Sequence, residues 1–129
     1  MSEESPVILV VDDDPVIVKL LEINFRLEGF QPRTATSGRQ AIELIRELRP
    51  ALVLLDLMMP GIDGWEVRRA MLEDPAIASI PVVVVSARSQ DEDRRQGYAL
   101  GVTEYITKPF DPAELVETVR TALRRSGSG

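Results

Sequence analysis

Residues 52–64 have the sequence LVLLDLMMPGIDG, which joins an apolar run to one carboxylate and two turn signals. The run beginning at Leu52 is unbroken rather than alternating, which is typical of a parallel strand covered by helices on both faces. Pro60-Gly61 and Asp63-Gly64 both favour turns. Asp56 is therefore expected where a buried strand ends, and open α/β sheets bind ligands at that edge.

Four other strand-like segments alternate with helical patterns along the rest of the chain. We expect these strands at 7–11, 31–35, 82–85 and 104–106, and helices at 15–28, about 37–49, about 64–73, 89–100 and about 111–125. Alternation with short connections predicts an α/β domain, with a doubly wound parallel sheet and helices on both faces. Val16, Ile23 and Leu27 widen the apolar stripe of the first helix, which predicts that this helix is buried on more than one side.

The length of 129 residues predicts one domain. We place it at 7–125, between a flexible N-terminus at 1–6 and a linker or expression tail at 126–129. The net charge of −6 argues against direct binding of this segment to nucleic acid or an anionic membrane. Without a signal peptide or an apolar run of membrane-spanning length, the expected location is the cytoplasm.

Cysteine and histidine are both absent from the sequence. This composition nearly excludes zinc and copper sites, whereas a cation that prefers oxygen ligands, such as Mg²⁺, remains possible.

Residues suited to one chemistry follow four of the predicted strands. Asp12 and Asp13 follow the first, and the third ends at Asp56; Ser86 and Lys108 follow the fourth and fifth. Parallel strands end at one edge, so these side chains are expected to converge. Ionised carboxylates at close range need a compensating cation, which Lys108 and Mg²⁺ could provide. Because a carboxylate can also act as a nucleophile, the set predicts formation of an aspartyl phosphate.

The motifs that carry these residues resemble the receiver domain of two-component response regulators, including the chemotaxis regulators. The resemblance covers about Val7 to Arg125 and rests on four segments in the family's order: VDDDP at 11–15, LDLMMP at 55–60 followed by DG at 63–64, SA at 86–87 and KPF at 108–110. It implies a flavodoxin-like fold with five parallel strands in the order 2-1-3-4-5 and five helices.

The resemblance also implies a role for each matching residue. Asp56 would accept a phosphoryl group from a sensor histidine kinase or a phosphotransfer protein. Mg²⁺ would be bound by Asp13, Asp56 and the backbone carbonyl of Met58, with Asp12 acting largely through water. The phosphoryl oxygens would contact Ser86, the amide of Ala87 and Lys108.

Tyr105 matches the family's aromatic switch, which would turn inward as Ser86 moves toward the phosphate. That movement would remodel the face formed by the fourth helix, fifth strand and fifth helix, and so control a downstream protein or an output domain. Such a domain is not an enzyme, although it assists its own phosphorylation and dephosphorylation. Met58 offers no side-chain hydrogen bond to an attacking water, which predicts slow self-dephosphorylation. The Lys108-Pro109 bond is cis in the family.

Three alternatives compete with this interpretation. A haloacid-dehalogenase-like, Mg²⁺-dependent phosphohydrolase also uses an aspartate nucleophile, but it needs a second aspartate at the position of Met58. A flavin-binding module would need a phosphate-binding loop where residues 12–14 are acidic. A receiver-like scaffold that is never phosphorylated is disfavoured by the complete set of acids, hydroxyl and lysine, but stays open.

Overall fold

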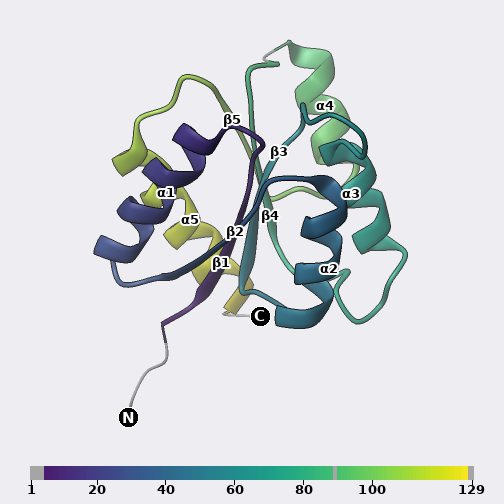
Figure 1. Ribbon diagram of the computed structural model, residues 1–129. Helices are drawn as coiled ribbons and strands as arrows, with labels where there is room; N and C mark the ends of the chain where they lie inside the picture. Colours follow the sequence, from purple (N-terminus) through teal and green to yellow (C-terminus); the bar gives the residue numbers. More distant parts are fainter. Residues whose placement is uncertain (1–4, 89, 128–129) are drawn as a thin grey trace.

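The computed structural model describes residues 5–88 and 90–127, without the side chains of residues 126 and 127. Strands and helices alternate from end to end, as predicted (Figure 1). The elements are β1 (Val7–Val11), α1 (Pro15–Leu27), β2 (Gln31–Ala35), α2 (Gly38–Leu48), β3 (Leu52–Asp56), α3 (Gly64–Leu72), β4 (Val82–Ser86), α4 (Asp91–Ala99), β5 (Glu104–Thr107) and α5 (Pro112–Gly127).

The ends of the chain are only partly described. Residues 1–4 and 128–129, where we expected flexibility, lie outside the described residues, as does Ser89 at the predicted start of the fourth helix. Pro6 is held to the sheet, because its carbonyl accepts a 2.8 Å hydrogen bond from the amide of Gln31. Helix α5 continues through Gly127, beyond the predicted boundary at residue 125. Within the described ranges, no helix combines the length and apolarity needed to cross a membrane.

The strands form one parallel sheet in the order β2-β1-β3-β4-β5, which confirms the fold class. The register pairs Val11 with Leu55, so β1 and β3 end side by side at the centre of the sheet. Asp56 pairs with Val85, and Ser86 pairs with Thr107. The residues that follow the strands therefore emerge along one edge, which we call the carboxyl edge.

Two apolar layers cover the faces of the sheet. On one face, Leu9, Val53 and Val84 belong to a buried cluster that includes residues of α2 and α3. On the other face, Ile8, Leu54 and Val83 belong to a cluster that includes residues of α1 and α5. Figure 1 shows α1 and α5 on one side of the sheet and α2, α3 and α4 on the other. Burial on both faces explains why β3 and β4 are apolar without alternation.

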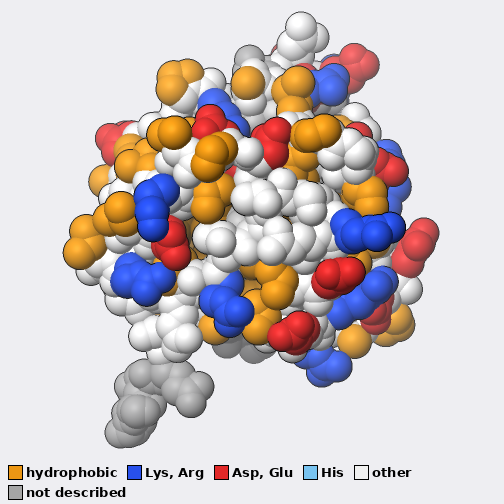
Figure 2. Space-filling view, viewed as in Figure 1, with side chains coloured by type: hydrophobic (Ala, Val, Ile, Leu, Met, Phe, Trp, Pro, Cys, Tyr) orange, Lys and Arg blue, Asp and Glu red, His pale blue; other side chains and the backbone are white. Residues whose placement is uncertain are grey.

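The prediction that α1 is buried on more than one side is wrong. Val16, Ile23 and Leu27 are 73%, 50% and 78% exposed, whereas Leu21 and Phe25 on the opposite side of the helix are buried against the sheet. A surface helix needs only one apolar face, and the second apolar stripe of α1 lies in solvent. Figure 2 shows hydrophobic side chains on the side of the molecule where α1 lies, among basic and acidic ones.

Two glycines hold the loop between β3 and α3 close to its neighbours. A Cβ atom at Gly64 would overlap the backbone of Asp56 and Leu57, and one at Gly38 would overlap Ile62. The amide of Gly64 donates a 3.1 Å hydrogen bond to the carbonyl of Leu57. The loop therefore folds back tightly over the end of β3, and this close approach sets the backbone position of Asp56.

Replacing Gly64 with alanine should destabilise the fold, because the overlapping atoms belong to backbone that cannot rotate away. We expect Gly64→Ala to lower the free energy of unfolding by about 1–3 kcal/mol, measured by urea denaturation. Gly97→Ala is the matched control, since its nearest new contact is a side-chain carbon of Tyr105 at 3.2 Å and alanine favours the helix interior. Equal losses in the two variants would contradict this explanation.

Candidate functional site

Three carboxylates converge at the carboxyl edge, as the sequence predicted. Asp12 and Asp13 follow β1, Asp56 ends β3, and one carboxylate oxygen from each lies within 4.8 Å of the other two. Asp12 and Asp56 are each 3% exposed, while Asp13 is open to solvent. The amide of Asp14 donates a 2.9 Å hydrogen bond to Oδ1 of Asp12, which holds the Asp12 side chain in place. The cluster is therefore a half-enclosed acidic pocket with one accessible side.

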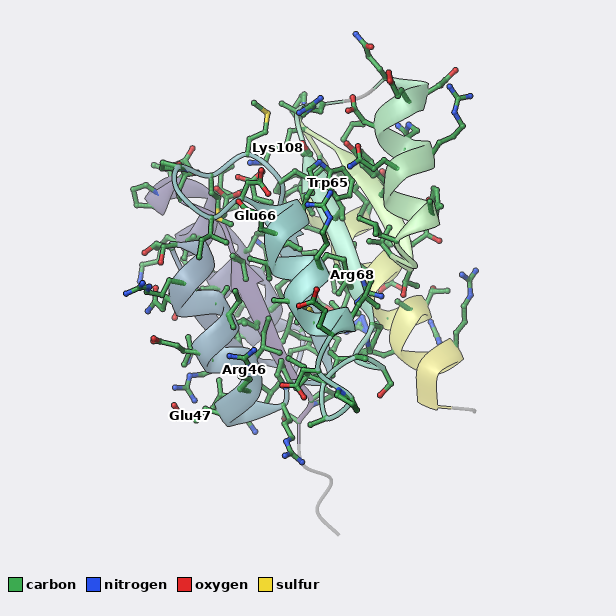
Figure 3. The ribbon with its side chains drawn as sticks, turned by 90° about the vertical axis from the view of Figure 1, so that its right-hand side faces the viewer. Arg46, Glu47, Trp65, Glu66, Arg68 and Lys108 are labelled. Carbon is green, nitrogen blue, oxygen red and sulfur yellow. The ribbon has the colours of Figure 1, made fainter. Side chains whose placement is uncertain are left out.

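Lys108, which follows the edge strand β5, brings a positive charge to these acids. Its Nζ lies 2.9 Å from Oδ2 of Asp12 and 3.7 Å from Oδ2 of Asp56. The amide of Lys108 donates a 2.9 Å hydrogen bond to the carbonyl of Ser86, and the Lys108-Pro109 peptide bond is cis. Figure 3 shows Lys108 at the end of the molecule where Trp65 and Glu66 begin α3, opposite the end where Arg46 and Glu47 lie.

The environment of Asp56 raises the affinity of its carboxylate for cations. Burial raises the pKa of Asp56 to about 6, reinforced by the charge of Asp12, while the amide of Met58 and the charge of Lys108 act in the opposite direction. Burial by itself would lower the pKa of Lys108, but its hydrogen bond to Asp12 and the nearby charge of Asp56 leave that pKa raised. One ammonium is thus too little positive charge for three acids, and a second cation would be bound favourably.

The residues expected around a phosphoryl group also lie at this edge. Ser86 is fully buried at the end of β4, and its Oγ accepts a 3.1 Å hydrogen bond from the amide of Arg88. Ala87 follows it and is exposed. The amide of Met58 donates a 3.2 Å hydrogen bond to Oδ1 of Asp56, while the Met58 side chain is 54% exposed. Asp56 thus accepts a hydrogen bond from its own loop, and Ser86 ends the neighbouring strand at the same edge.

Tyr105 already occupies an inward position in β5. It is 4% exposed, and its hydroxyl donates a 2.6 Å hydrogen bond to the carbonyl of Arg88. The guanidinium of Arg94 lies over the ring, 5.4 Å from its centroid, and donates to the Tyr105 carbonyl at 3.4 Å. Gly97 gives the ring room, since even a Cβ there would come within 3.2 Å of it. Tyr105 therefore joins β5 to α4 and to the segment after β4.

Two charged residues of this region were not identified from the sequence. Arg94 packs on the ring of Tyr105. Asp93 is 7% exposed in α4, and its Oδ1 lies 3.0 Å from Nη2 of Arg88. The sequence around Asp93 and Arg94 does not indicate these contacts. Only the folded chain places β5 and the segment after β4 beside α4.

The donor set fits a hard divalent cation. Carboxylate oxygens are the preferred protein ligands of Mg²⁺, which usually retains several waters and can share its remaining positions with phosphate oxygens. Asp13 is exposed, so a hydrated ion can approach the cluster from solvent. The pocket can therefore bring together a cation, a nucleophilic carboxylate and phosphate-binding donors.

Comparison with known proteins agrees with this geometry. The family model described as "Response regulator receiver domain" matches residues 8–120. The response regulator MtrA of Mycobacterium tuberculosis is 45% identical over 119 residues, which cover 92% of this chain and 51% of MtrA. The transcriptional regulator RpaA of Synechocystis is 40% identical over 121 residues, which cover 94% of this chain and 50% of RpaA. The chain thus spans about half the length of these curated relatives.

Solved structures show the same fold over nearly the whole chain. The receiver domain of Francisella response regulator 1452 matches with a TM-score of 0.87 and 30% identity, covering 95% of this chain and 99% of that one. The BeF3-activated receiver domain of Klebsiella pneumoniae RstA matches with a TM-score of 0.83 and 30% identity, covering 92% and 98%. By sequence, fold and family match, the chain belongs to the receiver domains of two-component response regulators.

Proposed function

We propose that Asp56 is the phosphoacceptor of this receiver domain. The observation that carries the proposal is the position of its carboxylate, buried at the end of β3 between two further acids and the ammonium of Lys108. In the reaction, an Oδ atom of Asp56 attacks phosphorus, the bond from phosphorus to the donor's imidazole nitrogen breaks, and the nitrogen keeps that electron pair. The donor would be a sensor histidine kinase or a phosphotransfer protein.

The surrounding residues would neutralise and hold the transferred group. Members of this family generally bind Mg²⁺ at an acidic cluster. Here Asp13, Asp56 and the carbonyl of Met58 would hold it directly, with Asp12 acting largely through water. The ion would offset charge on the phosphoryl oxygens. We assign Lys108, the hydroxyl of Ser86 and the amide of Ala87 to the phosphoryl oxygens, because all three lie at the same edge.

Phosphorylation would reach the surface through Ser86 and Tyr105. A phosphoryl group on Asp56 would draw the hydroxyl of Ser86 and shift the segment after β4, to which Tyr105 is bound through the Arg88 carbonyl. We propose that this selects the arrangement of the α4, β5 and α5 face that a downstream protein or output domain recognises. MtrA and RpaA are named as DNA-binding regulators, so a DNA-binding output is the first candidate. The expected location remains the cytoplasm.

The phosphohydrolase alternative is not favoured. Such an enzyme needs a general acid close to its nucleophile, whereas Met58 occupies that position and its side chain is 54% exposed. We therefore propose a signalling domain that promotes only its own phosphorylation and dephosphorylation.

Acetyl phosphate with Mg²⁺ should place one phosphoryl group on Asp56. We expect intact-protein mass spectrometry to show a single hydroxylamine-labile adduct in the wild type and none in Asp56→Asn. Asp111→Asn, which changes an exposed acid at the start of α5, is the matched control and should be phosphorylated normally. Catalytic turnover of phosphate esters, or an adduct that survives in Asp56→Asn, would refute the assignment.

Without metal, the acidic pocket should destabilise the fold as Asp56 ionises. The pKa of Asp56 is about 6 in the folded protein against an ordinary 3.8, so the folded state binds the proton more tightly between these values. The free energy of unfolding should therefore fall as pH rises through this window in EDTA, and Asp56→Asn should remove that fall. Above the window, Mg²⁺ should stabilise the wild type. Urea denaturation of the wild type and of Asp56→Asn at several pH values measures this effect. The same pH dependence of the unfolding free energy in both proteins would refute the prediction.

The phosphoryl group should persist because the Met58 side chain cannot orient an attacking water. We expect Met58→Gln, which adds a hydrogen-bonding amide of similar size, to shorten the lifetime of the aspartyl phosphate, measured as loss of the adduct after the phosphodonor is removed. Leu72→Gln, an exposed apolar-to-amide change on α3 away from the pocket, is the control. Decay of the wild-type adduct within seconds would contradict the prediction of slow self-dephosphorylation.

A further inference from the structure

Arg68 is a buried cation whose hydrogen bonds are only partly satisfied. It lies on α3, is 5% exposed, and donates from Nε to the carbonyl of Leu100 at 2.9 Å and from Nη2 to the carbonyl of Gly101 at 3.3 Å. Its Nη1 is buried and has no hydrogen-bond partner among the residues that the structure describes. A guanidinium carries five N–H donors, so the N–H groups of Nη1 are left without an acceptor among the described residues.

A cavity of about 420 Å³ lies beside this guanidinium. It is formed where β4 and β5 begin, at the end of the sheet opposite the acidic pocket, and α5 closes one side through Ala122 and Arg125. Figure 3 labels Arg68 on α3 and shows the C-terminal end of α5 to the right of α3. The cavity is large enough for a small organic ligand.

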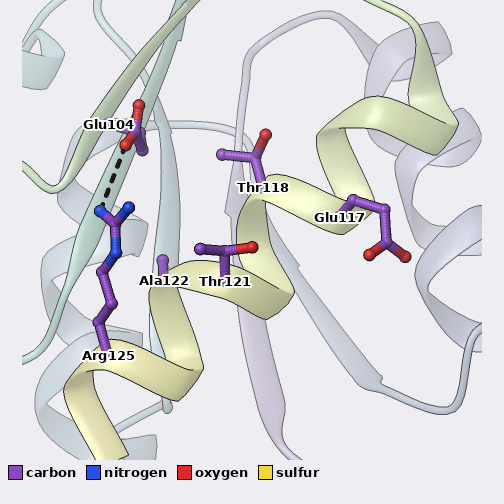
Figure 4. A pocket seen from close by; sticks show the side chains of 6 residues that line it. All are labelled: Glu104, Glu117, Thr118, Thr121, Ala122 and Arg125. Atoms are coloured by element: carbon purple, nitrogen blue, oxygen red, sulfur yellow. Dashed lines mark ion pairs between the residues drawn. The ribbon is translucent and has the colours of Figure 1, made fainter.

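The polar groups around this cavity suit an anion. Arg68 and Arg125 are both cations, Ser79 and Thr103 bring hydroxyls, and none of the described residues that line the cavity is acidic. This is unusual on a chain with a net charge of −6. Arg125 lines the cavity from α5. Its guanidinium lies 3.6 Å from a carboxylate oxygen of Glu104, and Figure 4 shows this pair in a neighbouring pocket. An exposed pair at this distance is weak.

We propose that this cavity, which we call the Arg68 cavity, binds a small oxyanion, either a phosphate or a carboxylate. The free edge of the Arg68 guanidinium would donate to two oxygens of the anion, and Arg125 would add a second cation from the mouth. The hydroxyls of Ser79 and Thr103 would complete the hydrogen bonds.

Ligand binding here would also bear on the conformation of the domain. Arg68 already joins α3 to the turn between α4 and β5 through Leu100 and Gly101. An anion bound by both Arg68 and Arg125 would tie α3, this turn and the end of α5 together. The proposal rests on the cavity and its lining, and it stands whether or not Asp56 is phosphorylated.

Amide NMR of the full chain in metal-free buffer can test the proposal at constant ionic strength. Inorganic phosphate and malonate are titrated separately, which distinguishes a phosphate site from a carboxylate site. We expect saturable shifts at the amides of Gly101 and Thr103 and at the Nε–H of Arg68, while the amide of Ala87 reports separately on the acidic pocket. Shifts restricted to Ala87, or no saturable shift at Gly101 and Thr103 with either anion, would overturn the proposal.

Two charge reversals on α5 separate a defined site from general electrostatics. Arg125→Glu should weaken binding by at least about tenfold, because it removes a charge-assisted contact. Arg124→Glu makes the same change at an exposed neighbour that does not line the cavity, and should weaken binding less than about twofold. Arg68→Lys keeps the charge but loses the planar fork, and should also weaken binding. Equal effects of Arg124→Glu and Arg125→Glu would refute the site.

Discussion

The chemistry of the carboxyl edge depends on electrostatic repulsion that the fold itself creates. Parallel strands bring Asp12, Asp13 and Asp56 together, with carboxylate oxygens within 4.8 Å of one another, and two of the three acids are buried. Lys108 compensates for only part of this charge, with its Nζ 2.9 Å from an oxygen of Asp12 and 3.7 Å from an oxygen of Asp56. Because burial and the charge of Asp12 raise the pKa of Asp56 to about 6, the pocket is prepared for a cation and for chemistry at one carboxylate.

The backbone determines where these groups lie. The register aligns the ends of β1 and β3, and Gly64 permits the loop after Asp56 to fold back onto the end of its own strand. On the same edge, Tyr105 and Arg94 join β5 to α4, and Tyr105 is bonded to the segment that follows Ser86. In the proposed switch, a change at Asp56 would reach the α4, β5 and α5 face through these contacts.

Most of the fold and the acidic pocket could be predicted because they follow from local patterns. Unbroken apolar runs identified the central strands, and residues at strand ends must share an edge once the sheet is parallel. Long-range packing could not be predicted in this way. Val16 and Leu27 look like core residues yet are exposed, because periodicity does not show which side a neighbour covers. Arg68 and Arg94 look like surface charges in the sequence. In the fold, Arg68 donates to the backbone carbonyl of Leu100 and Arg94 packs on the ring of Tyr105.

The most direct test of the central claim is a crystal structure of the protein with Mg²⁺ and beryllofluoride. The RstA receiver domain was activated with the same beryllium fluoride species. The account predicts one Mg²⁺ at about 2.1 Å from oxygens of Asp13, Asp56 and Met58. It also predicts beryllofluoride on Asp56, with its fluorines near Lys108 and Ser86. A metal bound elsewhere, or beryllofluoride absent from Asp56 under conditions that preserve the fold, would contradict it.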